Sequence, residues 1–311
     1  MSGYAHVPVL LEEAVSALCS VEGGTYLDGT FGGGGYARAI LTRSACQLYA
    51  IDRDPAAVAR ARALEGEYPG RFAILSGRIS ALAEMLAARG ITQLDGAVFD
   101  LGLSSYQIDD PMRGFSFKQD GPLDMRMGQA GRSAAELVNH ASEADLANIL
   151  YIYGEEKASR RVAKAIVTRR AVQPFTTTAD LAAVIRGVVR ADKSGIDPAT
   201  RSFQGLRIAV NEELADIEAA LAQAVSLLRP AGRLVVVSFH SLEDRIVKQF
   251  FAQVAGRVAA PSRHDPAGLM PQMEARFKLI TKSPLLPSAA ETHVNPRARS
   301  AKLRVIERLP A

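Results

Sequence analysis

Four consecutive glycines, Gly32–Gly35, lie between two aspartates in an arrangement that is typical of nucleotide-binding loops. Asp28 ends one apolar run just before the glycines, and Asp52 ends the next apolar run. Glycines let the backbone turn tightly and approach a ligand, and a carboxylate at the tip of the second strand can hold ribose hydroxyls. The glycine pattern alone fits NAD as well as S-adenosylmethionine. Asp28 favours S-adenosylmethionine, because its carboxylate would attract that ligand's ammonium group and repel a dinucleotide's pyrophosphate.

Asp100 opens a second polar group, which extends to Gln107 from the expected carboxyl end of a strand. Open α/β sheets place their reacting groups at such ends. Asp100 and the hydroxyls of Ser104 and Ser105 can accept hydrogen bonds from an amino group and orient its nitrogen towards a sulfonium methyl. The alternative is that the serines cap the next helix. His240, after a later strand, is a candidate general base or a residue that orients the substrate.

Aromatic and basic residues indicate a nucleic-acid substrate. Phe115 and Phe117 lie in a loop, where they can stack on a flipped base or, alternatively, form a small core cluster. Basic residues gather in two segments that together fit a polyanion footprint, although a helical charge run is usually a solvated face. They are Lys157, Arg160, Arg161 and Lys164 on one predicted helix, and Arg297, Arg299 and Lys302 near the C-terminus.

Strand-then-helix patterns repeat along the chain and predict a mainly parallel α/β sheet. The predicted strands cover Thr25–Leu27, Gln47–Ile51, Phe72–Ser76, Gly96–Leu101, Arg233–Phe239, Arg276–Thr281 and Ala301–Glu307. The last two strands are expected to form an antiparallel hairpin. This order predicts the Rossmann-like seven-stranded sheet of class I S-adenosylmethionine-dependent methyltransferases.

The strand pattern stops between Leu103 and Gly205, where helical spacing replaces it. One predicted helix covers Lys157–Arg170, and a long helix is expected over Gly205–Leu228. We therefore expect an inserted all-helical domain over 103–204 that recognises the substrate. The methyltransferase domain is expected to be discontinuous, over 1–102 and 205–311.

Composition excludes several classes of protein. With 311 residues, of which 48% are hydrophobic, the chain can form two domains. No apolar stretch reaches the roughly 18 residues of a membrane span, and no signal peptide is apparent. The two cysteines and five histidines lack metal-ligand spacing, so no metal is expected. The net charge of +4 favours an acidic partner. We expect a cytoplasmic protein and leave a homodimer open.

Taken together, these segments resemble the RsmH (MraW) family of small-subunit rRNA cytosine-N4 methyltransferases. The resemblance extends from the first ten residues nearly to the last ten. The segments that carry it are His6–Glu13, Asp28–Gly32, Ala50–Pro55, Asp100–Ser105, Arg113–Phe117, Gly121–Arg126, Leu206–Leu214, Ser238–Arg245 and Asn295–Arg304.

The resemblance implies methylation of the exocyclic N4 of one cytidine in the decoding centre of 16S rRNA, in the small ribosomal subunit. It implies S-adenosyl-L-methionine as methyl donor, with contacts at Gly34, Gly35, Tyr36, Asp52, Ile79, Asp100 and Gln107. Three residues depart from the family pattern. Tyr36 replaces a common His, Ile79 replaces an aromatic residue, and Tyr106 replaces a Pro.

A flipped cytosine is expected to enter between the loop that begins at Asp100 and the loop of Phe115 and Phe117. Its N4 would attack the methyl carbon in an in-line displacement. Two alternatives stay open: a methyltransferase for another RNA or a protein side chain, and a non-catalytic nucleotide-sensing or RNA-binding protein.

Overall fold

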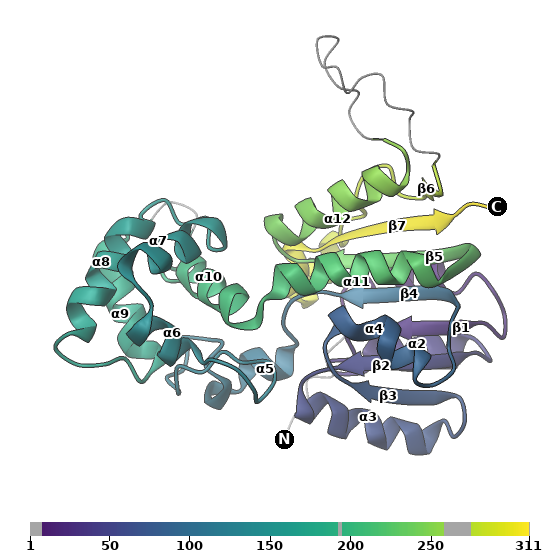
Figure 1. The fold of residues 1–311 in the computed structure, drawn as a ribbon, viewed down its shortest axis with the longest axis horizontal. Coiled ribbons are helices and arrows are strands. Elements are labelled where there is room, and N and C mark those ends of the chain that lie inside the picture. Colours follow the sequence, from purple (N-terminus) through teal and green to yellow (C-terminus); the bar gives the residue numbers. More distant parts are fainter. Residues whose placement is uncertain (1–7, 192–194, 258–274, 311) are drawn as a thin grey trace, which may run out of the picture. The chain divides into compact units, whose positions relative to one another are not determined.

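The structure, a computed structural model, describes residues 8–191, 195–257 and 275–310; His6, where one resembling segment begins, lies outside them. The chain divides into two compact units, drawn in Figure 1. The sheet unit comprises Met1–Gly102 and Leu214–Ala311, and the helical unit comprises Leu103–Glu213. The chain returns to the sheet unit later than the predicted residue 205, because the helix over 200–211 packs on other helices of the helical unit.

The sheet unit contains a seven-stranded sheet in the order β3-β2-β1-β4-β5-β7-β6. The first five strands run parallel, and β7 pairs antiparallel with both β5 and β6. The strands are β1 Thr25–Asp28, β2 Gln47–Asp52, β3 Phe72–Ser76, β4 Leu94–Asp100, β5 Leu228–Ser238, β6 Phe277–Leu279 and β7 Lys302–Arg308. The predicted seven-stranded sheet of the class I methyltransferases is thereby confirmed.

Helices cover both faces of this sheet, because its central strands are apolar on both faces. In β4, Val98 belongs to one core cluster, whereas its neighbours Ala97 and Phe99 belong to the other. The first cluster includes α1 Leu11–Leu18, α2 Gly35–Arg43 and α3 Pro55–Glu67, and the second includes α4 Leu82–Ala87, α11 Glu213–Leu227 and α12 Ser241–Val254. A shorter helix, α13 Ala289–Val294, precedes β7.

The helical unit forms a third core cluster of its own. Its helices are α5 Ser105–Asp109, α6 Ala134–His140, α7 Glu143–Ile152, α8 Ser159–Arg170, α9 Thr178–Val188 and α10 Thr200–Asn211. α8 begins two residues after the predicted start at Lys157, since the buried Glu156 accepts a hydrogen bond from Ala158 N (2.7 Å) in the preceding turn.

The prediction of one long helix over Gly205–Leu228 was wrong. The chain breaks at Glu212, whose φ of 53° is left-handed, and this residue separates α10 from α11. The side chain of Asn211 explains the break. Its amide accepts a hydrogen bond from Met127 N (2.8 Å) and donates one to Met125 O (2.7 Å). These bonds join the end of α10 to the loop that contains Met125 and Met127.

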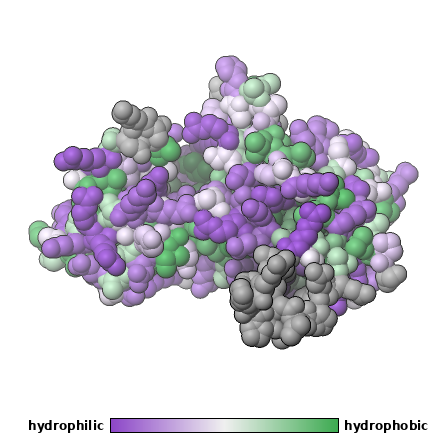
Figure 2. Space-filling model, turned by 90° about the horizontal axis from the view of Figure 1, so that it is seen from above, coloured by the Kyte–Doolittle hydropathy of each residue, from purple (hydrophilic) through white to green (hydrophobic). Residues whose placement is uncertain are grey.

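Polar residues cover most of the face shown in Figure 2, where hydrophobic side chains are scattered between them. The exposed large apolar residues include Val172 (86% exposed) and Val294 (79% exposed), which lie in different units. Within 8–191, 195–257 and 275–310, no helix is long and apolar enough to cross a membrane.

Asp244 of α12 joins that helix to the C-terminal strand β7. It accepts hydrogen bonds from Arg304 Nε (2.7 Å) and Lys302 Nζ (2.9 Å), and both Asp244 and Arg304 are buried. Burial acts to raise the pKa of Asp244, but the hydrogen bonds from Arg304 and Lys302 outweigh it and lower the pKa. Asp244 therefore holds α12 against β7 as a carboxylate.

We expect Asp244→Ala to lower the free energy of unfolding by about 3 kcal/mol, because it leaves the Arg304 guanidinium buried without its carboxylate. The matched control is Glu12→Ala, which removes a mostly exposed ion pair with Arg43 and should cost about 1 kcal/mol at most. Urea unfolding followed by circular dichroism measures both. Equal losses in the two variants would contradict the role given to Asp244.

Candidate active site

Three carboxyl groups, here named the three-carboxylate site, lie at or just after the carboxyl ends of adjacent parallel strands. Asp28 ends β1, Asp100 ends β4, and Glu243 lies in the first turn of α12, shortly after β5. Asp28 is 1% exposed and Glu243 is fully buried. The sheet order changes direction between β1 and β4, and ligands of open α/β sheets bind at such a switch point.

Two of these groups hold an oxygen that has no hydrogen-bond partner within the described residues. Asp28 Oδ1 accepts from Thr30 N (3.1 Å), whereas its Oδ2 is buried without a partner. Asp100 Oδ1 is likewise buried without a partner, and its backbone N donates to Thr30 Oγ1 (2.6 Å). Because buried acceptors are normally satisfied, these two oxygens mark a place for a ligand donor.

Burial makes ionisation of these groups unfavourable. It raises the pKa of Asp28 to about 7, and the nearby charge of Asp52 adds to this, although the backbone N–H groups of Thr30 and Ala37 act against it. Burial, followed by the charges of Asp28 and Glu243, holds the pKa of Asp100 well above its usual range. A bound cation would stabilise the carboxylate forms and relieve this cost.

The glycine loop is held by Asp52 and by close packing. Asp52 Oδ2 accepts from Gly32 N (2.8 Å), and its Oδ1 accepts from Asp54 N (2.8 Å). Gly34 has a φ of 78°, and a Cβ there would lie 2.6 Å from the Phe31 ring. A carboxylate oxygen can accept more than one hydrogen bond, so Asp52 keeps capacity for ribose hydroxyls.

The predicted cofactor contacts at Gly35, Tyr36 and Ile79 lie in different surroundings. A Cβ at Gly35 would lie 2.1 Å from Pro8 Cγ, so α2 begins in close contact with the N-terminal segment. Tyr36 is buried in the core, and its hydroxyl donates to Val9 O, which leaves its backbone for a ligand. Ile79 is partly buried where a short 3-10 turn begins. Their ligand contacts stay predictions.

Ser104 shows the alternative role, as a helix cap. Ser104 Oγ accepts from Gln107 N (3.3 Å) and Gln107 Oε1 accepts from Ser104 N (3.1 Å), which forms a capping box at the start of α5. Ser105 is the first residue of that helix. The catalytic roles of both serines and the cofactor contact of Gln107 stay predictions.

His240 likewise caps a helix, and its partner is a residue that sequence reasoning missed. Its Nε2 lies 2.9 Å from Glu243 Oε1, and Glu243 Oε2 accepts from Phe239 N (2.8 Å). Glu243 thus orders the turn between β5 and α12 and adds to the negative charge near Asp100. The spacing His-x-x-Glu, a capping pattern, was the available signal.

Both candidate stacking rings belong to the core of the helical unit, which is the alternative left open above. Phe115 is buried there. Phe117 packs edge-on against Phe203, with ring centroids 4.7 Å apart, and the Arg186 guanidinium lies 5.3 Å from its ring. Stacking of either ring on a base stays a prediction.

The predicted RNA-binding cations divide into two groups. All but Lys302 are exposed. Within the described residues, the side chains of Lys157, Arg160, Arg161, Lys164 and Arg299 form no hydrogen bond or ion pair. Lys302 pairs with Asp244. Those with exposed side chains are Lys157, Arg160, Arg161, Lys164, Arg297 and Arg299. The described ranges hold no cluster of ligands that could bind a metal ion.

The comparisons with known proteins decide the family. The model of the MraW methylase family matches residues 3–309. The chain belongs to this family. The predictions of the family, of a methyltransferase and of S-adenosyl-L-methionine as its methyl donor are thereby confirmed.

Similar proteins extend over the whole chain. It is 64% identical over 310 residues to the Ribosomal RNA small subunit methyltransferase H of Acidiphilium cryptum, over 99% of each chain. The same name belongs to a Granulibacter bethesdensis protein that is 58% identical, over 97% of this chain and 91% of that one. A solved structure, the N-methyltransferase NodS from Bradyrhizobium japonicum, has a TM-score of 0.42 at 10% identity and covers 97% of this chain and 93% of that chain.

The residues present fit this methyl donor. It carries an ammonium and a sulfonium charge, and the buried acceptors Asp28 Oδ2 and Asp100 Oδ1 lack donors within the described residues. Asp28 would hold its ammonium group, the charge of Asp100 would stabilise its sulfonium, and Asp52 would hold its ribose. When bound, the donor would supply a methyl carbon that an amine nitrogen can attack, with the sulfur as leaving group.

The raised pKa of Asp28 makes a prediction about stability. A folded-state pKa of about 7 lies above the unfolded value of about 4, so the contribution of Asp28 to stability is present below pH 4 and is lost as the pH rises to 7. Because asparagine does not ionise, Asp28→Asn removes this pH-dependent loss of stability. We expect the variant to gain stability relative to the unsubstituted protein between about pH 4 and pH 7, in urea unfolding without ligand.

Glu67→Gln is the opposite control. The hydrogen bond from Arg38 lowers the pKa of Glu67, so its contribution is lost as the pH falls, and this variant should lose relative stability as the pH rises through the acid range. A difference between Asp28→Asn and the unsubstituted protein that does not change with pH would contradict the burial argument.

Proposed function

We propose that this protein transfers a methyl group from S-adenosylmethionine to the exocyclic N4 of a cytidine in the decoding centre of 16S rRNA. The shared name of its close relatives supports small-subunit rRNA as the substrate. The choice of N4 rests on the family resemblance of the Asp100–Ser105 segment. The observation that carries the proposal is the pair of buried acceptors, Asp28 Oδ2 and Asp100 Oδ1, at the ends of β1 and β4.

Asp100 carries out the central step. The lone pair of an exocyclic amine is delocalised into the ring, so the nitrogen must be oriented before it can react. Asp100 Oδ1 accepts a hydrogen bond from the N4 amino group and directs the nitrogen at the methyl carbon. As the N–C bond forms and the C–S bond breaks, the nitrogen releases one proton. Asp100 accepts it, since its pKa is raised by burial and by the charges of Asp28 and Glu243.

The other residues bind and position. Asp28 accepts a hydrogen bond from the ammonium group of the donor, and Asp52 accepts from its ribose. His240 and Glu243 order the turn between β5 and α12 beside Asp100. A cytoplasmic location and a flipped base stay predictions, and a homodimer stays open.

The decisive test is the modification itself. In a strain that lacks the gene, mass spectrometry of 16S rRNA should show no N4-methylation at the decoding-site cytidine, and the intact gene should restore it. A gene with Asp100→Asn should restore it at a rate lower by about 100-fold, because an amide cannot take the proton that N4 releases. Unchanged N4-methylation in the deletion strain would overturn the proposal.

The helical unit supplies positive charge for RNA. Arg160 and Arg161 are exposed in the first turn of α8, whereas Arg169 at the end of the same helix donates to Asp180 (3.0 Å). We propose that the first two neutralise RNA phosphates and that Arg169 supports the fold.

This assignment can be tested by salt dependence. Arg160→Gln with Arg161→Gln should weaken binding to 30S subunits and reduce the slope of log affinity against log salt by about 1.4 to 1.8. Arg169→Gln, on the same helix, should leave that slope unchanged. If Arg169→Gln reduced the slope as much as the double variant, the assignment would fail.

A further inference from the structure

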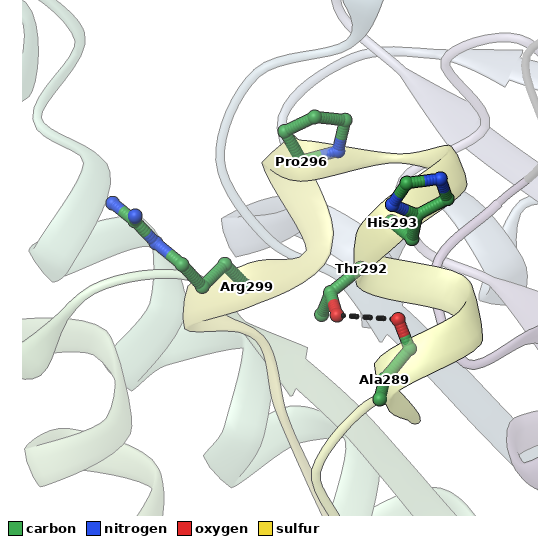
Figure 3. Close-up of a pocket in the computed structure, with 5 residues that line it drawn as sticks. All are labelled: Ala289, Thr292, His293, Pro296 and Arg299. Carbon is green, nitrogen blue, oxygen red and sulfur yellow. Dashed lines mark hydrogen bonds between the residues drawn. The ribbon is translucent and has the colours of Figure 1, made fainter.

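A pocket of about 490 Å³ lies on the segment just before β7. It is lined by Ala289, Thr292 and His293 of α13 and by Pro296 and Arg299 of the 3-10 turn η4 Pro296–Ser300. Figure 3 shows Arg299 and His293 on either side of the turn, with Pro296 and Thr292 between them. The volume falls within the range of about 300–1,000 Å³ that is common for small-molecule sites.

The core of the sheet unit holds this segment in place. Ala298 and Ala301 are fully buried in the same core cluster as α1 and α2. Asn295 begins the turn, since its side chain accepts from Arg297 N (3.1 Å) and its carbonyl accepts from Ala298 N (2.9 Å). The lining residues therefore stand on a backbone that is fixed before any ligand binds.

Arg299 places a positive charge at the pocket. His293 and Arg299 are both exposed, and their side chains form no hydrogen bond or ion pair within the described residues. The acidic residue of the segment, Glu291, accepts a hydrogen bond from Leu10 N (2.7 Å) at the start of α1. Glu291 thus ties α13 to the start of α1, while the Arg299 guanidinium has no partner within the described residues.

We propose that this pocket binds one nucleotide of a single-stranded segment of the RNA substrate. Arg299 takes the phosphate, because a guanidinium offers paired donors in the geometry that phosphate requires. The imidazole of His293 stacks on the base, as aromatic side chains do in single-stranded RNA recognition. Ala289 and Pro296 form the apolar wall. This inference rests on RNA being the substrate, but it places a contact outside the three-carboxylate site.

The test is fluorescence anisotropy of the full chain with a labelled ten-nucleotide oligouridylate at several KCl concentrations. Arg299→Gln should weaken binding and reduce the slope of log affinity against log salt by about 0.7, the value for one phosphate of a single strand. His293→Ala should weaken binding by about tenfold at every salt concentration without a change of slope, because stacking is not ionic. Arg89→Gln, an exposed arginine elsewhere in the sheet unit, should have no effect.

Two outcomes would overturn the proposal. One is unchanged affinity and slope in both pocket variants. The other is displacement of the oligomer by uridine monophosphate or inorganic phosphate at equal concentration, which would indicate a site for a free anion.

The same variants keep this proposal separate from the proposed function. Calorimetry with S-adenosylmethionine should give the same affinity for Arg299→Gln and His293→Ala as for the unsubstituted protein, which also shows that both variants fold. If the pocket variants bound RNA normally while 16S rRNA were still methylated, only the pocket assignment would fall. If the unsubstituted protein had no N4-methylation activity, the proposed function would fall instead.

Discussion

The structure depends on burying carboxyl groups where two parallel strands end side by side. Asp28 and Asp100 cannot move apart, because β1 and β4 are paired in register up to Asp28 and Val98. A buried carboxylate without a partner is costly, so the unliganded site favours protonation. A cationic ligand offsets that cost, and by linkage its binding must also stabilise the fold. Affinity for the donor and instability of the empty site are therefore two results of one arrangement.

The remaining elements keep that arrangement in place. Two neighbouring acids of α12 bind different parts of the sheet unit. Glu243 accepts a hydrogen bond from Phe239 N and so orders the turn after β5, whereas Asp244 binds Arg304 of β7. The antiparallel pairing of β7 with β5 brings Arg304 opposite Val236 and so beside α12. The seventh strand thus fixes the helix that carries Glu243, although it contributes no residue to the three-carboxylate group.

Sequence patterns predicted the strands and the glycine loop because these depend on local periodicity and on acids at strand ends. They were less informative about side chains whose hydrogen bonds are set by the fold. Ser104 and His240 both precede a Gln or Glu by three residues, and both cap helices. The break at Glu212 follows from the tertiary contacts of Asn211 with Met125 and Met127, which no local pattern contains. α13 was missed because six residues are too few for a period to show.

The same limit applies to charge. In the sequence, Lys302 resembles Arg299, and Arg169 resembles Arg160. In the structure, Lys302 shares Asp244 with Arg304, and Arg169 pairs with Asp180. These acids lie 58 and 11 residues away from Lys302 and Arg169 in the chain. The charge available to RNA is therefore smaller than a count of basic residues suggests, and its position is set by where the fold places its acids. Binding strength should therefore follow Arg160, Arg161, Lys164 and Arg299, and net charge alone should be a poor guide to it.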